Sequence, residues 1–187
     1  VNCIDPTFVS DGCVDDSFVA MVVGCGSTGC EVARFLYEYS AFASSDGSDN
    51  PRRVILVDQD VDRLCGELRI VAPTIFNSDE LVSVDSKAGS AAFWDVFSEY
   101  VQDLDCICVA LGNDDLDMEL VQHLYKAVHS LKLKVQHGFK IFLRVYSVEN
   151  ESRIMRLANY FNEFKDTTGI EIVPFGSVSS IFSYDVI

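Results

Sequence analysis

The sequence predicts an α/β fold with a doubly wound, mostly parallel sheet of about six strands and helices on both faces. Short apolar segments alternate with segments of helical periodicity about six times along the 187 residues, which is typical of repeated βα units. The apolar segments are continuous rather than alternating, as expected for strands that are covered on both faces. A glycine-rich turn between the first strand and the first helix also favours this fold class.

The first half of the chain supplies three strands and the helices between them. A continuous apolar run predicts a strand over 18–24, and the spacing of apolar residues predicts a helix over 27–42. Residues 43–53 are rich in Ser, Asp, Asn and Gly, which predicts a loop. The next elements are a strand over 54–58, a short helix over 61–73 that is halted at its proline, and a strand over 80–86.

The second half repeats the alternation, and its predicted elements are helix 90–103, strand 105–112, helix 114–132, strand 140–147, helix 149–165 and strand 169–176. The helix over 114–132 begins with acidic residues, where the helix dipole favours them. We therefore divide the chain into an N-terminal extension over 1–17, one Rossmann-like domain over 18–176 and a C-terminal extension over 177–187.

The composition narrows the classes of partner. The formal net charge is −15, with 14 Lys and Arg residues, which are too few and too scattered to neutralise a nucleic acid or to bind an acidic membrane surface. No apolar run reaches the roughly 18 residues that a membrane span needs. The chain begins at Val1, so we treat it as a fragment or a processed chain, with room for a membrane segment outside it.

Seven cysteines are present, and none forms a Cys-x-x-Cys pair, which argues against a zinc ribbon; they are Cys3, Cys13, Cys25, Cys30, Cys65, Cys106 and Cys108. We expect reduced thiols and a cytoplasmic location. Cys25 lies inside the glycine turn, where it is either a buried filler or a reactive thiol. We predict no metal site.

The glycine turn has the spacing G-x-G-x-x-G at Gly24, Gly26 and Gly29. The first glycine permits a tight exit from the strand, the second leaves room for a pyrophosphate, and the third lets the helix approach the sheet. Cys25, Ser27 and Thr28 complete the turn, and the amides at the helix start can point at phosphates. No Walker lysine follows, so the turn is not a P-loop.

A dinucleotide site of this kind needs an acid at the end of the second strand to bind the ribose hydroxyls. Asp58 fills that place, followed by Gln59, although it lies 29 residues after Gly29 and the usual interval from the motif is about 20. The polar loop over 43–53 accounts for the excess. Because a carboxylate repels a 2′-phosphate, we expect NAD(H) or an adenosine nucleotide (ATP, ADP or AMP) rather than NADP(H).

Three further residues are candidates because the carboxyl ends of parallel strands meet at one edge. Asp85 ends the third predicted strand, and it either faces the adenine or ribose or stabilises a turn. Gly112 and Asn113 follow the fourth strand, where they either approach the ligand or form a simple turn.

We predict no catalytic residue. The sheet consumes almost the whole chain, which leaves little for a substrate pocket. His123, His129 and His137 do not lie at the carboxyl end of a predicted strand, so we expect surface or structural roles for them, and no Tyr-x-x-x-Lys pair occurs. The chain is better suited to binding a nucleotide than to reacting with it.

The order of motifs resembles the nucleotide-binding domain of the RCK/TrkA-N (KTN) family, the regulatory domains of potassium channels and transporters. The resemblance spans about residues 18–175 and depends most on the segments "DLDCICVALGNDDLDMELVQHLYKA" and "KIFLRVYSVENESRIMRL". It implies a dimer that binds NAD(H), ATP or ADP and shifts a gate elsewhere. The nucleotide contacts that it implies are Gly24, Gly26, Gly29, Asp58 and Asp85. Arg144 would lie near phosphates or a partner subunit, or it is a surface or salt-bridge residue. The longer loop before the second strand and the end of the chain depart from the family pattern.

Two enzyme classes are alternatives. The segments "GCGSTGCEVA" and "LVDQDVDRLCGELR" also resemble the ATP-dependent adenylating ThiF/ubiquitin-activating fold, in which an arginine, here Arg69, would grip phosphates. That family has Asn-Leu-x-Arg-Gln where this chain has Gly-Glu-Leu-Arg-Ile over 66–70. A small NAD-dependent oxidoreductase is the second alternative.

Overall fold

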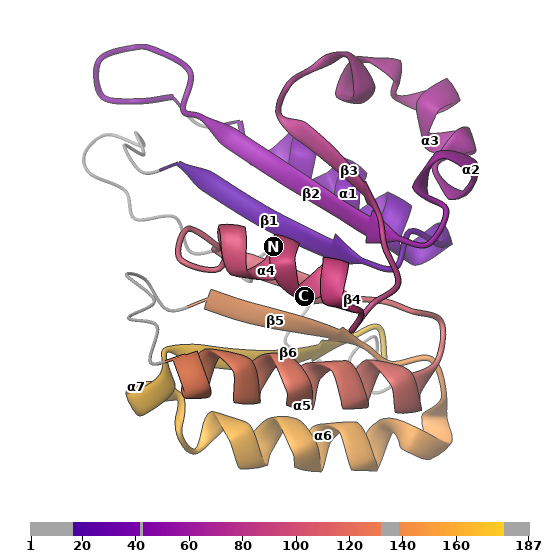
Figure 1. Cartoon of the computed structure of the whole chain (residues 1–187), viewed down its shortest axis with the longest axis vertical. Helices are drawn as coiled ribbons and strands as arrows, with labels where there is room; N and C mark the ends of the chain where they lie inside the picture. Colours follow the sequence, from indigo (N-terminus) through magenta and orange to yellow (C-terminus); the bar gives the residue numbers. More distant parts are fainter. Residues whose placement is uncertain (1–16, 42, 132–138, 178–187) are drawn as a thin grey trace, which may run out of the picture.

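The computed structural model describes residues 17–41, 43–131 and 139–177, and a six-stranded sheet forms the centre of this part of the chain (Figure 1). Every neighbouring pair of strands is parallel, and the strand order is β3-β2-β1-β4-β5-β6. The strands are β1 (Phe18–Val23), β2 (Arg52–Asp58), β3 (Leu81–Asp85), β4 (Cys106–Val109), β5 (Phe139–Arg144) and β6 (Ile170–Phe175). This confirms the predicted Rossmann-like, doubly wound α/β fold.

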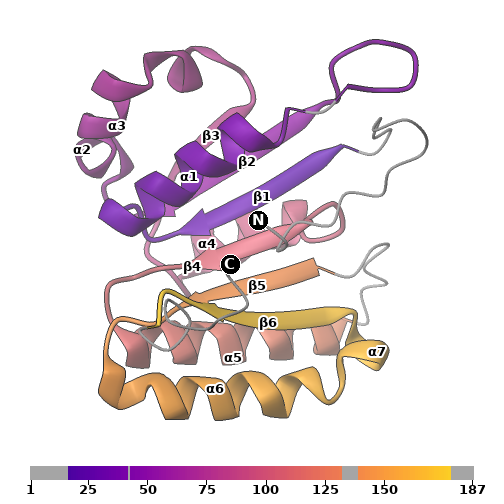
Figure 2. The same cartoon turned by 180° about the vertical axis from the view of Figure 1, so that it is seen from behind.

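One face of the sheet is covered by α1 (Ser27–Tyr39), α2 (Val61–Leu64), α3 (Gly66–Val71) and the 3₁₀-helix η1 (Pro73–Asn77) (Figure 2). The prediction of a single helix over 61–73 is wrong, because the chain leaves the helical conformation at Cys65 and α3 begins at Gly66, a weak helix former. Buried Val61, Cys65 and Leu68 still face the same core.

The other face is covered by α4 (Ala91–Tyr100), α5 (Asp114–Leu131) and α6 (Val148–Asn162), and the short α7 (Lys165–Thr168) leads into β6 (Figure 1). Phe93 and Phe97 of α4 are fully buried against the sheet. The helix predicted over 149–165 is divided in two, since the chain turns after Asn162 before α7 begins.

The burial of the central strands explains their continuous apolar sequences. All residues of β1 and β4 are buried, so these strands read as continuous apolar runs. β3 lies at the edge of the sheet and is only partly buried. Because β1 and β4 are neighbours whose helices cover opposite faces, their carboxyl ends form the switch point at which α/β sheets bind ligands.

The loop between α1 and β2 lies at the opposite edge of the sheet from this switch point (Figure 1). A short antiparallel bridge pairs Ala43 with Asp49 within it. The extra residues therefore lengthen the connection without displacing the end of β2. Within the described residues, no helix has the length and apolar character needed to cross a membrane.

Most of the two predicted extensions, together with Cys3, Cys13 and His137, lies outside the described residues.

Candidate functional site

The turn after β1 packs against its surroundings through two of its three glycines. Gly24 has a φ of 98°, and a Cβ atom there would lie 2.2 Å from the carbonyl oxygen of Ala110 at the end of β4. A Cβ atom on Gly29 would lie 1.8 Å from the carbonyl oxygen of Gly24. A Cβ atom on Gly26 would meet nothing within 4 Å. The fold therefore requires two glycines, and the third leaves open space in front of the turn.

The N-terminus of α1 is open to an anion. Gly26 precedes the helix and has no side chain to cap it, and the first turn contains no acidic residue. The first amides of a helix have no partner within the helix and carry its partial positive charge. Ser27 is exposed and Thr28 is half-buried, so the site can be reached from solvent.

Asp58 holds this turn to the end of β2. One carboxylate oxygen accepts a hydrogen bond from the Cys25 N–H at 2.7 Å, and the other accepts one from the Gln59 N–H at 2.6 Å. A carboxylate can accept about four hydrogen bonds, so Asp58 keeps lone pairs for hydroxyl groups. Asp58 is half-buried, and Gln59 is exposed beside it.

A cavity of about 490 Å³ opens next to Asp58. Its apolar lining includes Leu111, Leu116 and Leu120, and its polar lining includes Asp58, Gln59, Lys87, Ser90, Glu119 and His123. Sequence reasoning found the two β2-end residues and missed the others. The spacing of Leu116 and Leu120 on α5 was a signal for one apolar wall, but the contribution of the turn over 87–90 depends on the fold. His123 is exposed on α5, as expected for a surface role, and it also lines this cavity.

A second cavity of about 660 Å³ lies on the other side of the turn, between α1 and the ends of β5 and β6. Its lining extends along α1 from Ser27 and Thr28 to Tyr39, and it also includes Arg144, Phe175 and Gly176. The Arg144 guanidinium donates to the carbonyl oxygens of Val145 and of Gly176, the latter at 2.6 Å, and lies over the Tyr146 ring at 5.1 Å. These contacts fix the Arg144 guanidinium in the same cavity as the start of α1, where Arg34, Glu31 and Glu38 add charges of both signs.

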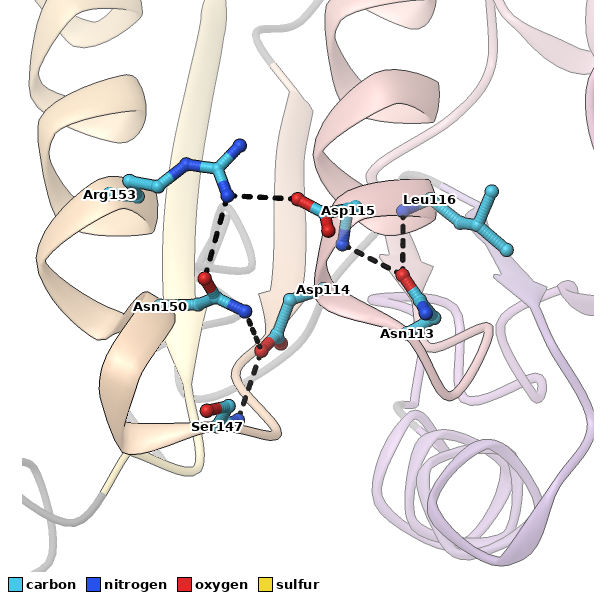
Figure 3. A network of polar contacts seen from close by, with 7 residues as sticks. All are labelled: Asn113, Asp114, Asp115, Leu116, Ser147, Asn150 and Arg153. Atoms are coloured by element: carbon cyan, nitrogen blue, oxygen red, sulfur yellow. Dashed lines mark hydrogen bonds and ion pairs between the residues drawn. The ribbon is translucent and has the colours of Figure 1, made fainter.

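The other three candidates at the carboxyl edge have structural hydrogen bonds. Asp85 accepts from the Val61 N–H at 2.9 Å, which caps α2. Gly112 has a φ of 85° and donates its N–H to the Tyr146 hydroxyl at 3.2 Å. Asn113 accepts from the N–H groups of Asp115 and Leu116, which caps α5 (Figure 3). None of the three lines either cavity. Their contact with a ligand stays a prediction.

A polar network that sequence reasoning missed joins α5 to α6 (Figure 3). The buried Asp114 carboxylate accepts from the Tyr146 N–H at 2.8 Å, the Ser147 N–H at 3.0 Å and the Asn150 side-chain amide at 3.1 Å. Arg153 adds an exposed ion pair to Asp115 at 2.9 Å. This network fixes the β5–α6 turn against the start of α5.

Asp117 is a second buried carboxyl group at the start of α5. One oxygen accepts from the Leu111 N–H at 2.9 Å, and the other has no hydrogen-bond partner in the described part of the chain. Burial raises the pKa of Asp117 from 3.8 to about 7, and the nearby Asp114 carboxylate adds to the increase. Through its hydrogen bond to the Leu111 N–H, Asp117 holds the turn between β4 and α5.

Arg69, the arginine of the adenylating alternative, lies in neither cavity. It pairs with Asp62 at 2.6 Å and stacks over the Phe76 ring at 4.2 Å. These contacts hold it on the surface of α3.

The fold and the turn define a Rossmann-like α/β domain with an open helix N-terminus at its switch point. No protein-family model and no curated protein matches the chain. Among the residues that the structure describes, no group of three or more His, Cys, Asp or Glu side chains is placed to hold a metal ion.

Proposed function

We propose that this domain binds an adenine nucleotide, with NAD(H) as the preferred ligand, and acts as a sensor or regulatory module. One observation carries the proposal: the uncapped N-terminus of α1 and the Asp58 carboxylate are held together across the glycine turn by the Cys25–Asp58 hydrogen bond. An anion site and a hydroxyl-binding acid that lie side by side at the edge of the sheet suit the phosphate and the ribose of one nucleotide.

The two cavities favour a dinucleotide over a mononucleotide. The adenosine half would enter the cavity beside Asp58, with its base against Leu111 and Leu116. The pyrophosphate would lie at the start of α1, and Arg144 would offset its charge from the second cavity. The remaining half of the ligand would occupy that second cavity. A 2′-phosphate would lie against the Asp58 carboxylate, which favours NAD(H) over NADP(H).

Sensing would proceed by a shift of populations, in which the ligand binds one arrangement of a homodimer better than another. The resemblance to channel and transporter regulatory domains extends the proposal to a membrane segment outside this chain. The cysteines of the described residues are free thiols, which supports a reducing, cytoplasmic setting for the domain. Sedimentation of the chain with and without NAD⁺ tests the ligand-dependent dimer.

The adenylating enzyme is the main alternative, and the contacts of Arg69 away from both cavities count against it. ATP–pyrophosphate exchange in the presence of a carboxylic acid separates the two classes. Steady exchange would overturn the sensor proposal, and so would steady turnover of NAD(H) with a small substrate, which would support an oxidoreductase.

The decisive experiment is a thermal-shift panel of NAD⁺, NADH, NADP⁺, ATP, ADP and AMP, followed by calorimetry, because a ligand specific for the folded state stabilises it by mass action. Asp58→Asn should weaken NAD⁺ binding by about 1–3 kcal/mol and reduce the preference over NADP⁺. Asp166→Asn is the matched control, since Asp166 is an exposed acid of α7, at the opposite edge of the sheet. If no adenine nucleotide binds at millimolar concentration, the proposal is wrong.

A further inference from the structure

Three cysteines from separate parts of the chain meet beneath the glycine turn: Cys25 in the turn, Cys30 in α1, and Cys65 between α2 and α3. The sulfur atoms of Cys30 and Cys65 are 3.6 Å apart, and the Cys25 thiol lies within hydrogen-bonding reach of Cys65. Cys25 and Cys65 are fully buried, and Cys30 is half-buried. Of the three, Cys30 is the residue that has solvent-exposed area.

The Cys30 thiol is also bonded to the turn. It donates to the carbonyl oxygen of Cys25 at 3.1 Å. The N–H of Cys25 donates to Asp58, so a displacement of Cys25 also disturbs the acid that the proposed ribose site depends on.

We propose that Cys30 and Cys65 form an intramolecular disulfide when the domain meets a hydroperoxide, and that this bond weakens nucleotide binding at the turn. The second half of the statement rests on the function proposed above. A disulfide is about 2.0 Å long, so the sulfurs must approach each other, and the Cys30 thiol loses its hydrogen bond to the Cys25 carbonyl. Gly24 and Gly29 are in close contact, so a movement of the turn toward Cys65 would shift the Ser27 and Thr28 amides between them.

The reaction has two steps. The Cys30 sulfur, as the thiolate, attacks one oxygen of the hydroperoxide; the O–O bond breaks, the other oxygen leaves as an alcohol or water after it takes a proton, and Cys30 becomes a sulfenic acid. The Cys65 sulfur then attacks the Cys30 sulfur, and the S–O bond breaks to release water with the Cys65 proton. The two thiols together lose two electrons and two protons, and the hydroperoxide accepts both.

The surroundings make this pair slow to react at neutral pH. The contact with Cys65 and burial both raise the pKa of the Cys30 thiol. The contact with Cys25, followed by burial, raises the pKa of Cys65 to about 12. Since the thiolate is the attacking form, bond formation should accelerate as the pH rises. The bond should therefore form only during sustained exposure to a hydroperoxide.

Peptide mapping tests the bond. Cys3→Ser and Cys13→Ser serve as the background, because both residues lie outside the described part of the chain. After treatment with hydrogen peroxide, we expect a tryptic link between peptides 1–34 and 64–69 that is absent in Cys30→Ser and in Cys65→Ser. Cys108→Ser is the matched control, a buried cysteine of β4 that should leave the link intact. No link in the parent, or a link that survives in Cys30→Ser and so joins Cys25 to Cys65, would overturn the proposal.

Calorimetry tests the coupling. We expect NAD⁺ to bind the peroxide-treated protein about tenfold more weakly than the reduced protein, and dithiothreitol to restore the affinity. Cys30→Ser should bind NAD⁺ equally before and after treatment; Cys30→Ala replaces it if the serine variant does not fold. A mapped disulfide with unchanged NAD⁺ affinity would overturn the coupling alone. If the reduced parent binds no nucleotide, the proposed function and the coupling both fall, and the mapping still decides whether the disulfide forms.

Discussion

Helices α1 and α5 both begin at the carboxyl edge of the sheet, at the ends of the neighbouring strands β1 and β4. No side chain caps α1, and its first turn has no acidic residue. The start of α5 is capped by Asn113 and carries Asp114, Asp115 and Asp117 in its first turn. Two helices that begin at the same edge of the sheet therefore present opposite charge there.

The position of a helix in the fold therefore does not decide which charge its N-terminus presents. The N-terminal amides of α5 attract negative charge as those of α1 do, but the carboxylates of its own first turn already supply it. Asp114 then uses its charge to hold the β5–α6 turn rather than a ligand. The start of α1 is thus free for the proposed ligand, whereas the start of α5 supports the fold.

Removing the buried carboxylate at the start of α5 should have the strongest consequence for stability. Asp114→Ala removes the acceptor of three hydrogen bonds and leaves the N–H groups of Tyr146 and Ser147 without it. We expect a loss of roughly 3 kcal/mol in the free energy of unfolding, measured by urea denaturation. Asp115→Ala is the control, because its ion pair is exposed and should contribute less than about 1 kcal/mol. Equal losses in both variants would show that the network is not what holds the turn.

The next test adds an acidic residue to the first turn of α1. Ser27→Asp places a carboxylate where the first turn of α1 now has none, and it should weaken NAD⁺ binding by about 2 kcal/mol through repulsion of the pyrophosphate. The same change should leave the fold intact or stabilise it by about 0.3–1 kcal/mol, since an acid suits the start of a helix. Ser27→Ala separates the charge from the loss of the hydroxyl. An affinity that Ser27→Asp leaves unchanged would contradict a phosphate site at α1.

A pH experiment examines Asp117, the buried acid in the first turn of α5. Because the folded pKa of Asp117 is about 7 and its ordinary value is 3.8, the folded protein retains a proton between these values that the unfolded chain has lost. The Asp117 carboxylate therefore lowers the free energy of unfolding increasingly as the pH rises from about 4, and this loss is complete above about 7.

Asp117→Asn keeps an acceptor for the Leu111 N–H and removes the charge. We expect the variant to gain roughly 1–2 kcal/mol over the parent at pH 8, and the difference to shrink as the pH falls to 5, measured by thermal unfolding. A difference that is the same at both pH values would show that Asp117 does not titrate in this range.

The smallest expected effect concerns the cap itself. Asn113→Ala removes the oxygen that accepts from the Asp115 and Leu116 N–H groups, and it should cost about 1 kcal/mol of stability. The corresponding change at α1, Gly26→Ala, should alter stability little, because the site has no capping side chain and open space for a methyl group. It should nevertheless weaken NAD⁺ binding, since the methyl group would enter the space in front of the turn. If Gly26→Ala unfolds the domain, that glycine serves the fold and not a ligand.

The glycine turn and the start of α1 could be predicted from the sequence. The contacts at the start of α5 could not. The spacing of Gly24, Gly26 and Gly29 and the apolar run before them are local, and each glycine has the steric surroundings that the motif predicts. Asp58 could be placed because it ends a strand, although a lengthened loop precedes it. The parallel sheet followed from the same local alternation of strands and helices.

The partners of Asp114 lie more than thirty residues along the chain, at Tyr146, Ser147 and Asn150. No local pattern relates them, so the acids of α5 could be predicted only as favourable neighbours of the helix dipole. Asp85 shows the same limit, since a carboxylate that ends a strand can face a ligand or cap a helix, and its bond to Val61 depends on where α2 begins. The cysteine cluster likewise joins segments that only the fold brings together.

The loop between α1 and β2 also offers a practical opening for protein engineering. Its tip is exposed around Gly47, and the loop lies at the end of the sheet opposite the glycine turn (Figure 1). Exposed loop tips of this kind tolerate inserted domains and new chain termini. A circularly permuted fluorescent protein placed there would report on the stiffness of α1 and β2, the two elements that frame the glycine turn, and would convert the domain into a genetically encoded indicator.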